Sequence, residues 1–314
     1  MNSVRSFLIS AENAGIRIDR FLTQHYPQQS RSAIQKWFEK AAVRVNDHTV
    51  KASYKLRDQD RIEIIEVFAE STGQVALTPW KFPLDILYED EALLAIHKPA
   101  HTVVHPGAGV SEHTIVHAAL HYFPGIQNVG HPLRPGIVHR LDKETSGVLL
   151  IGKTQDSYLK MTSLFKDRLI QKHYRAAVFG RMEKARGRIE KPLGRDPSNR
   201  KKISIRARRA RPAITLYSVL QNYDFGSLLD VEILTGRTHQ IRVHLSSENH
   251  PIFGDTKYGG GNWNRIQDVD LRSRLKQASF FGLHAFSLEF DHPITGKHLF
   301  LEAPLPEIWQ ELAG

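Results

Sequence analysis

Apolar residues recur at helical spacing in two stretches near the start of the chain. Ile18, Phe21 and Leu22 share one face of a first helix, which Pro27 would end. Ser30 is a typical N-cap for a second helix. The apolar face of that helix consists of Ala33, Ile34, Trp37, Phe38 and Ala41, and the opposite face carries Arg31, Gln35, Lys36, Glu39 and Lys40.

Alternating apolar and polar residues predict strands on both sides of these helices. Strands are expected within residues 1–10, at 43–47 and at 61–65. Residues 66–79 show no clear period, which is typical of a linker.

The length of the chain also favours two domains. Its 314 residues correspond to two domains of roughly 100–200 residues each. We predict a first domain at residues 1–72, a linker at 73–79 and a second domain at 80–314.

The second domain shows a mixture of strand and helix patterns. Strands are predicted at residues 84–88, 92–96, 137–138, 148–151, 172–180 and 228–234, and helices at 114–122, 157–169 and from Gly236 to Leu245. Residues 259–280, rich in Gly, Asn and Arg, are expected to form a surface excursion. The mixture predicts an α+β fold.

A polar, turn-forming centre lies between two apolar runs at residues 135–151. Its polar residues are His139, Arg140, Asp142, Lys143, Glu144, Thr145 and Ser146, and Gly147 closes it. Core strands on both sides would hold such a loop rigidly, and rigidly held loops often carry catalytic groups. The alternative is a salt-bridged structural turn, because structural ion pairs are common.

Composition narrows the possible partners and chemistry. The net charge of +10 indicates a polyanionic partner, either nucleic acid or an anionic membrane, although a plain basic protein would also fit. The absence of cysteine excludes disulfides, thiolate zinc sites and cysteine nucleophiles. No stretch approaches the ~20 apolar residues of a membrane span. The N-terminus is too short and polar for a signal peptide, so we expect a cytoplasmic protein.

The densest basic stretch is residues 195–211. Eight of these seventeen residues are Lys or Arg, and Asp196 is the only acidic one. The stretch has little apolar periodicity, which predicts an extended hairpin or loop. Its charge suits contact with several phosphates, with Arg200 and Lys201 as candidates.

Three histidines raise the question of a metal site. His113, His117 and His121 are spaced i, i+4 and i+8, but a straight helix supplies only two ligands to one ion easily. No cluster of Asp or Glu accompanies them, which argues against a metal-dependent nuclease or hydrolase. We therefore predict no metal site and interpret these side chains as hydrogen-bonded or facing solvent.

The motif His139-Arg140-Leu141-Asp142-x-x-Thr145-Ser146-Gly147 resembles the signature of the RluA-type pseudouridine synthase family. Residues 235–245, 251–259, 283–286 and 292–296 match further motifs of that family, so the resemblance covers nearly the whole chain. It implies a catalytic domain with a mixed, mostly antiparallel, bent central sheet flanked by helices.

The first domain resembles an S4 domain, a small RNA-binding module of the αL type. Ser30-Arg31-Ser32 and Val43-Arg44-Val45-Asn46 carry this resemblance. A helix N-terminus with an added arginine suits phosphate contact. A solvated helix face is the alternative. The candidate RNA-binding residues are Arg31, Lys36, Arg44, Arg200, Lys201 and Arg237.

The family reaction breaks the N1–C1′ bond of a uridine, rotates the base and forms a C5–C1′ bond. The reaction involves no net redox change, so no cofactor is expected. The resemblance implies that Asp142 is the catalytic carboxylate, and leaves open whether it attacks C1′, attacks C6 or assists elimination to a glycal. It also implies that Arg140 helps to extrude the target nucleotide and that Tyr174 packs on the base.

A neighbouring arginine would keep the Asp142 carboxyl ionised, since an adjacent guanidinium lowers a carboxyl pKa by roughly 1–3 units. The resemblance indicates Arg242 for this position, with Arg237 as the less favoured choice. We expect His139 to be structural, and Lys143 and Glu144 to face solvent. Hydrogen bonds between the backbone and the Thr145 and Ser146 hydroxyls are expected to hold the loop.

The expected substrate is RNA, namely large-subunit ribosomal RNA or its precursor particle. The sequences at residues 105–109 and 134–136 are most similar to those of the family branch that modifies helix 69 of the large-subunit RNA. A relative that modifies other 23S sites is the alternative. A non-catalytic S4-type RNA-binding protein is the competing function. Asp142 argues against it, because a carboxylate repels phosphate. We expect a monomer.

Overall fold

The computed structural model describes residues 4–26, 31–65, 77–107, 110–259, 261 and 263–312. The chain divides into two compact units, one of Met1–Thr78 with His131–Pro135 and the other of Pro79–Gly130 with Gly136–Gly314. The expected N-cap Ser30 and most of the predicted linker lie outside the described residues. Among the described helices, none is long and apolar enough to cross a membrane.

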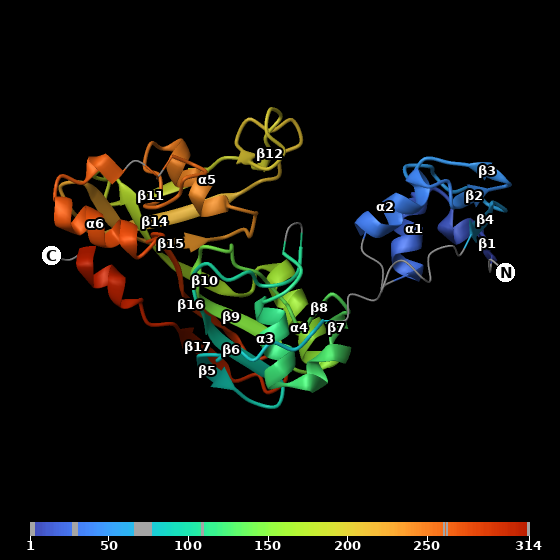
Figure 1. Cartoon of the computed structure of the whole chain (residues 1–314), viewed down its shortest axis with the longest axis horizontal. Helices are drawn as coiled ribbons and strands as arrows, with labels where there is room; N and C mark the ends of the chain where they lie inside the picture. Colours follow the sequence, from blue (N-terminus) through green and yellow to red (C-terminus); the bar gives the residue numbers. More distant parts are fainter. Residues whose placement is uncertain are drawn as a thin grey trace. The chain divides into compact units, whose positions relative to one another are not determined.

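The first unit contains a four-stranded antiparallel sheet with the order β1-β4-β2-β3 (Figure 1). Its strands are β1 (Val4–Leu8), β2 (Val43–Val45), β3 (His48–Thr49) and β4 (Arg61–Ile65). Its helices are η1 (Ala11–Asn13), α1 (Ile18–His25) and α2 (Arg31–Glu39). The two predicted helices and the strand predicted at residues 61–65 are confirmed.

Apolar side chains from both helices and the sheet form the core of this unit. Ile18 and Leu22 of α1, Ile34 of α2 and Ile62 of β4 are fully buried. Their spacing is the one that the sequence pattern predicts for inward-facing positions. Exposed polar positions of α2 therefore lie on the side away from this core.

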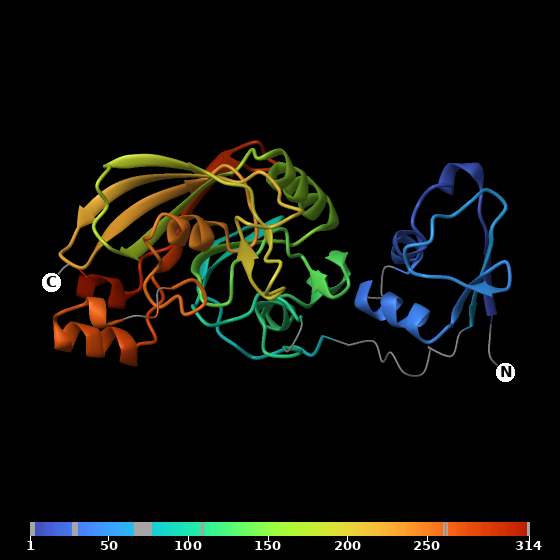
Figure 2. The ribbon, with the colours of Figure 1, turned by 90° about the horizontal axis from the view of Figure 1, so that it is seen from above.

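The second unit is built on a nine-stranded sheet. Its order is β11-β14-β15-β10-β16-β9-β6-β5, and β17 also pairs with β16. All pairings are antiparallel except that of β9 with β16, which confirms the predicted mixed, mostly antiparallel sheet. Figure 2 shows the long paired strands β14 and β15. The strands are β5 (Ile86–Glu89), β6 (Leu93–Lys98), β9 (Ser146–Gly152), β10 (Gln171–Phe179), β11 (Arg186–Glu190), β14 (Ile214–Asn222), β15 (Gly226–Ile233), β16 (Leu283–Asp291) and β17 (His298–Glu302).

Helices pack on this sheet through separate apolar clusters. Met161 of α4 joins Leu93, Val148 and Leu150 in one cluster, whereas Ile241 of α5 joins a second cluster with β10 and β15. The helices are α3 (Ile115–Tyr122), α4 (Gln155–Asp167), α5 (Gln240–Ser247) and α6 (Val269–Gln277), with 3-10 turns η2 (Pro124–Asn128), η3 (Trp263–Arg265) and η4 (Glu307–Leu312). Two small hairpins pair β7 (Gly130–His131) with β8 (Arg134–Pro135), and β12 (Gly194–Arg195) with β13 (Ile203–Ser204).

Two sequence predictions for the second unit were wrong. Ile137 forms only an isolated bridge with Ile151, so residues 137–138 do not end a strand. The segment 259–280 is not merely a surface excursion, since it contains α6. Asp268 caps that helix by accepting the Leu271 N–H at 2.9 Å, and burial of Leu271 and Leu275 anchors it.

A glycine allows the central loop to enter the sheet. Gly147 has a φ of +116° and lies beside Ala285 of the parallel neighbour β16. A Cβ atom at this position would lie 2.1 Å from the Ala285 carbonyl oxygen. The close approach of β9 to β16 therefore requires glycine here and fixes where the loop before it can lie.

Candidate active site

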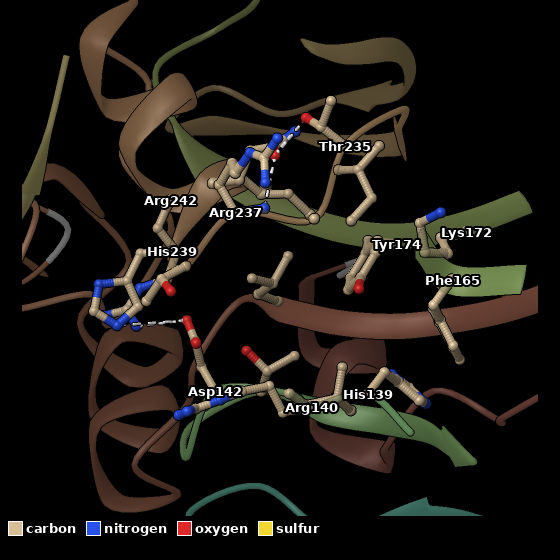
Figure 3. A pocket seen from close by; sticks show the side chains of 18 of the residues that line it. His139, Arg140, Asp142, Phe165, Lys172, Tyr174, Thr235, Arg237, His239 and Arg242 are labelled. Atoms are coloured by element: carbon tan, nitrogen blue, oxygen red, sulfur yellow. Dashed lines mark hydrogen bonds and ion pairs between the residues drawn. The ribbon is translucent and has the colours of Figure 1, made fainter. Parts of the chain in front are cut away.

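A hollow of about 450 Å³ opens in the second unit beside the loop that carries Asp142. Figure 3 shows Asp142, His239 and Arg242 at one end of it, and Phe165 and Lys172 at the other. Its volume falls within the range of roughly 300–1,000 Å³ that is typical of small-molecule sites.

A second hollow of about 400 Å³ lies on the other side of Asp142 and extends to Lys257. It shares Arg140, Asp142, His239 and Arg242 with the first. Asp142 thus lines both hollows.

A buried lysine ties the Asp142 loop to the end of β6. Lys98 is fully buried, and its Nζ donates to the carbonyl oxygens of Pro99 at 2.7 Å, Thr102 at 2.9 Å and Lys143 at 3.2 Å. Burial lowers the pKa of Lys98 to about 7. The Thr145 N–H closes the loop by donating to the Asp142 carbonyl at 3.2 Å.

Arg242 is held between two carboxylates. Its Nε and Nη2 donate to Asp255 at 2.7 and 2.9 Å, and its Nη1 donates to Asp142 Oδ2 at 2.9 Å. Burial alone would lower the pKa of Arg242, but the two carboxylates outweigh it and the net shift is upward. The bidentate contact fixes the guanidinium plane, so Arg242 presents one donor to Asp142 in a defined direction.

His239 occupies the N-cap of α5 in a left-handed conformation, with a φ of 54°. Its Nδ1 lies 2.7 Å from the Tyr258 hydroxyl, and its Nε2 lies 3.8 Å from Asp142 Oδ2. Burial lowers the pKa of His239 to about 4, although Asp142 opposes this shift. The imidazole is therefore neutral at pH 7.

Tyr174 comes from the middle of the sheet. The register of β10 against β16 shifts between His173 and Tyr174, and such bulges bend a strand and re-aim its side chains. Burial and then the charge of Asp142 raise the pKa of Tyr174, so its phenol stays protonated. The ring lines the hollow on the wall opposite the Asp142 loop (Figure 3).

The structure does not bring all predicted residues to this hollow. Arg140 lines it with an exposed side chain, and Arg237 lines it while donating to the Pro212 carbonyl at 3.2 Å. Arg200 and Lys201 are exposed between the strands of the β12–β13 hairpin. In the first unit, Lys36 and Arg44 are exposed, and the Arg31 side chain lies outside the described part.

Several predictions about the central loop need correction. The Ser146 hydroxyl contacts His284 Nδ1 at 2.8 Å rather than a backbone atom. The buried Thr145 hydroxyl has no hydrogen-bond partner within the described residues. Glu144 is not simply solvent-facing, because its Oε2 lies 4.0 Å from Arg242 Nη1. Lys143 is exposed, as expected.

His139 supports the loop through one of its ring nitrogens and through its ring face. Its Nε2 accepts the Leu150 N–H at 2.9 Å, and its ring stacks on Phe165 with centroids 4.5 Å apart. Burial and then the charge of Lys172 lower the pKa of His139 to about 3. The imidazole is therefore neutral, and its Nε2 is occupied by the Leu150 N–H.

The three histidines near α3 do not converge on one point. His117 is buried and its Nδ1 lies 2.7 Å from the Thr114 hydroxyl at the helix N-terminus. Across the described ranges, no three His, Cys, Asp or Glu side chains are arranged to hold a metal ion.

Sequence reasoning missed four residues that shape the site: Lys98, His239, Asp255 and Tyr258. Three of them lie inside segments that the motif comparison had already marked, so their position was available but their contacts were not. Lys98 follows the strand predicted at residues 92–96, and a lone lysine after an apolar run carries no signal for three carbonyl acceptors.

Comparison with known proteins gives matches to both units. Residues 92–247 match the family described as RNA pseudouridylate synthase, and residues 16–62 match the S4 domain. A relative from Nitrosomonas europaea, named ribosomal large subunit pseudouridine synthase D, is 38% identical over 94% of this chain and 82% of its own length. The Escherichia coli O157:H7 protein of the same name is 35% identical over 97% of this chain and 91% of its own.

A solved structure agrees with the fold of the second unit. The chain titled Human RNA Pseudouridylate Synthase Domain Containing 4 is 28% identical and superposes with a TM-score of 0.55. The match covers 73% of this chain and 92% of that one.

Proposed function

Because this chain belongs to the RluA-type family of RNA pseudouridine synthases and carries an S4 domain, we propose that it acts on specific uridines of large-subunit ribosomal RNA, with Asp142 as the essential carboxylate. The ionic arrangement at Asp142 carries the catalytic part of this proposal. The names of the relatives from Nitrosomonas europaea and Escherichia coli support the substrate.

The chemistry sets what the site must do. The N1–C1′ bond of the uridine breaks, the base turns, and a C5–C1′ bond forms. C5 loses its proton and N1 gains one, so the product is an isomer of the substrate. Such a reaction needs one ionised carboxylate and a site that holds the detached base. Water must also be excluded from C1′ after the N1–C1′ bond has broken.

Asp142 suits the role of that carboxylate. Its side chain is 17% exposed, and Arg242 holds Oδ2 from one direction. A buried guanidinium that is already fixed by Asp255 costs no reorganisation when the substrate arrives. The guanidinium therefore fixes the orientation of the carboxylate before the substrate arrives.

The walls of the hollow suit a uracil turned out of the RNA helix. The ring of Tyr174 provides a flat surface for the base, and Arg140, exposed at the rim, is placed to occupy the position that the base leaves.

Basic surfaces outside the hollow suit the RNA backbone. In the proposed complex, Arg200 and Lys201 of the β12–β13 hairpin contact phosphates near the target. Arg237 contacts the RNA at the rim, and the S4 domain uses Arg31, Lys36 and Arg44. Their contribution is electrostatic, so binding weakens steeply as salt rises.

Mapping of pseudouridines in ribosomal RNA tests the substrate assignment. RNA from cells that lack the gene is compared with RNA from the parent and from cells in which the gene is restored. We expect a small number of large-subunit pseudouridines to disappear on deletion and to return on restoration. An unchanged large-subunit map, with losses in another RNA instead, would refute the substrate assignment.

A further inference from the structure

A continuous line of polar contacts leads from the basic hairpin to Asp142. The Ile203 N–H of β13 donates to the Tyr258 hydroxyl at 2.9 Å, and that hydroxyl lies 2.7 Å from His239 Nδ1. His239 Nε2 then lies 3.8 Å from Asp142 Oδ2. One imidazole ring thus links the Tyr258 segment, and through it the basic hairpin, to the Asp142 loop. The ring lies beside the carboxylate at one end of the hollow (Figure 3).

The directions of these hydrogen bonds follow from the chemistry of their groups. A backbone N–H can only donate, so the Tyr258 oxygen accepts from Ile203 and its own proton is free for His239 Nδ1. Because burial lowers the pKa of His239 to about 4, the ring is neutral at pH 7 and carries one proton. When the Tyr258 hydroxyl donates to Nδ1, that proton sits on Nε2, which faces Asp142.

The backbone of His239 is in a conformation that few residues accept. Its φ of 54° lies in the left-handed region, where Asn, Asp and His are the most frequent residues after glycine. Such strain persists only where the surroundings hold it in place. In this protein, the left-handed backbone conformation places the His239 ring between the Tyr258 hydroxyl and the Asp142 carboxylate.

We propose that His239 is a positioning residue for Asp142, to which it presents an Nε2–H, and that Tyr258 fixes the ring in the tautomer that makes this possible. The inference rests on the proposed role of Asp142. A separation of 3.8 Å is too long for a hydrogen bond, and catalytic contacts of this kind often shorten only when the substrate is bound. The Nε2–H thus becomes a second donor to the carboxylate, beside Arg242.

Other charged groups also surround the ring. Arg242 and Lys257 both lower the pKa of His239, whereas Asp142 and Asp255 raise it. Arg242 already uses its Nη1 on Asp142 and its other donors on Asp255. Arg242 is therefore already engaged, and Lys257, which lines the second hollow together with Asp142, is the other cation near the ring.

Two amide substitutions separate positioning from mere structural support. In His239→Gln the amide nitrogen reaches about as far as Nε2, whereas in His239→Asn it reaches only about as far as Nδ1. Asparagine tolerates a positive φ better than glutamine, so a purely structural role makes the asparagine variant at least as stable and at least as active. Positioning predicts the opposite order of kcat: about tenfold or more lost in His239→Asn, and a much smaller loss in His239→Gln.

Tyr258→Phe tests how the tautomer is fixed. Without the hydroxyl, a ring with its proton on Nδ1 would turn a lone pair toward Asp142. We expect kcat to fall with little change in KM, and the acid limb of the kcat–pH profile to move to higher pH, because the anionic carboxylate loses a donor. In a His239→Asn background the same change should add little, as a double-mutant cycle would show.

The measurements use the full chain and a large-subunit RNA fragment over a range of concentrations that gives both kcat and KM, with thermal unfolding of each variant recorded in parallel. Equal kcat for His239→Asn and His239→Gln, or unchanged pH profiles in all three variants, would overturn the positioning role. Asp142→Asn is included in the same series. If Asp142→Asn keeps its activity, the proposed function itself is refuted. If only the His239 variants keep full activity, the positioning role alone is refuted.

Discussion

Arg242 lies between two carboxylates with different surroundings. Asp255 is 1% exposed and takes both bidentate donors, whereas Asp142 is 17% exposed and takes one. Asp255 therefore fixes the orientation of the Arg242 guanidinium, and Arg242 in turn fixes the orientation of the Asp142 carboxylate, which faces the hollow. This chain of dependence makes Asp255 part of the site, although it does not line the larger hollow.

Replacing Asp255 by asparagine should destabilise the protein and slow the reaction. Breaking one side of a buried ion pair costs about 3–5 kcal/mol of unfolding free energy, and the released guanidinium no longer points one donor at Asp142. We expect kcat to fall by at least about tenfold, since that corresponds to roughly 1.4 kcal/mol. Denaturant unfolding and turnover check both effects.

Asp85→Asn is the matched control, because the Asp85 side chain is 66% exposed and pairs with the His97 imidazole at 3.2 Å. Its stability and turnover should stay close to those of the parent. Equal behaviour of the two variants would contradict the role given to Asp255.

At the level of elements, the Asp142 loop is fixed from both sides. Lys98 at the end of β6 binds the loop through the Lys143 carbonyl, and Gly147 lets β9 lie close to β16 directly after the loop. The position of the Asp142 carboxylate thus depends on the packing of β6, β9 and β16 against one another.

Gly147→Ala tests this dependence. The new Cβ would lie 2.1 Å from the Ala285 carbonyl oxygen in a backbone region that alanine disfavours, so the strand must shift. We expect a loss of about 2 kcal/mol or more in the unfolding free energy of this domain, with a loss of activity. Gly107→Ala is the control, because nothing lies within 4 Å of its added Cβ. A shift of the unfolding midpoint no larger than in that control would refute the argument.

The local pattern of apolar and polar residues predicted helices and strands better than it predicted the contacts between them. The alternation at residues 61–65 and the helical spacing after Ile18 depend on neighbours in sequence, and both elements are present. Residues 137–138 were wrongly expected in a strand because two apolar residues are too short a run to show a period. The helix α6 was overlooked although Asp268, Leu271 and Leu275 carry its cap and its spacing.

The site was predictable only where a motif marked it. The pairing of Asp142 with Arg242 spans 100 residues, and no local pattern reports such a contact. The motif resemblance named both residues. It did not show that Asp255 clamps the arginine or that Tyr258 touches His239, because these contacts depend on the register of distant segments.

At the level of the whole molecule, three enclosed neutral imidazoles make the fold sensitive to acid. Burial lowers the pKa of His139 to about 3, and that of His239 and His284 to about 4. An unfolded chain binds these protons near pH 6.5, so it takes up more protons than the folded chain as the pH falls below that value. The stability that these three histidines contribute is therefore fully present above about pH 6.5 and is lost progressively as the pH falls from there toward their pKa values of about 4 and about 3 in the folded protein.

Thermal unfolding between pH 7.5 and pH 5 should show a falling midpoint. His139→Gln should flatten this dependence, because glutamine takes no proton in this range while its carbonyl oxygen can still accept the Leu150 N–H that His139 now accepts at 2.9 Å. A midpoint that does not change with pH in the parent, or the same slope in the variant, would contradict this interpretation.

The central claim is that Asp142 carries the reaction, and Asp142→Asn tests it most directly. Asparagine keeps the size of the side chain and removes its charge, so RNA binding through the basic surfaces should remain close to that of the parent. Release of tritium from RNA labelled at uridine C5 reports each C5–C1′ bond formed. We predict parent-like RNA affinity with no detectable tritium release. Release at the parent's rate from this variant would contradict the account.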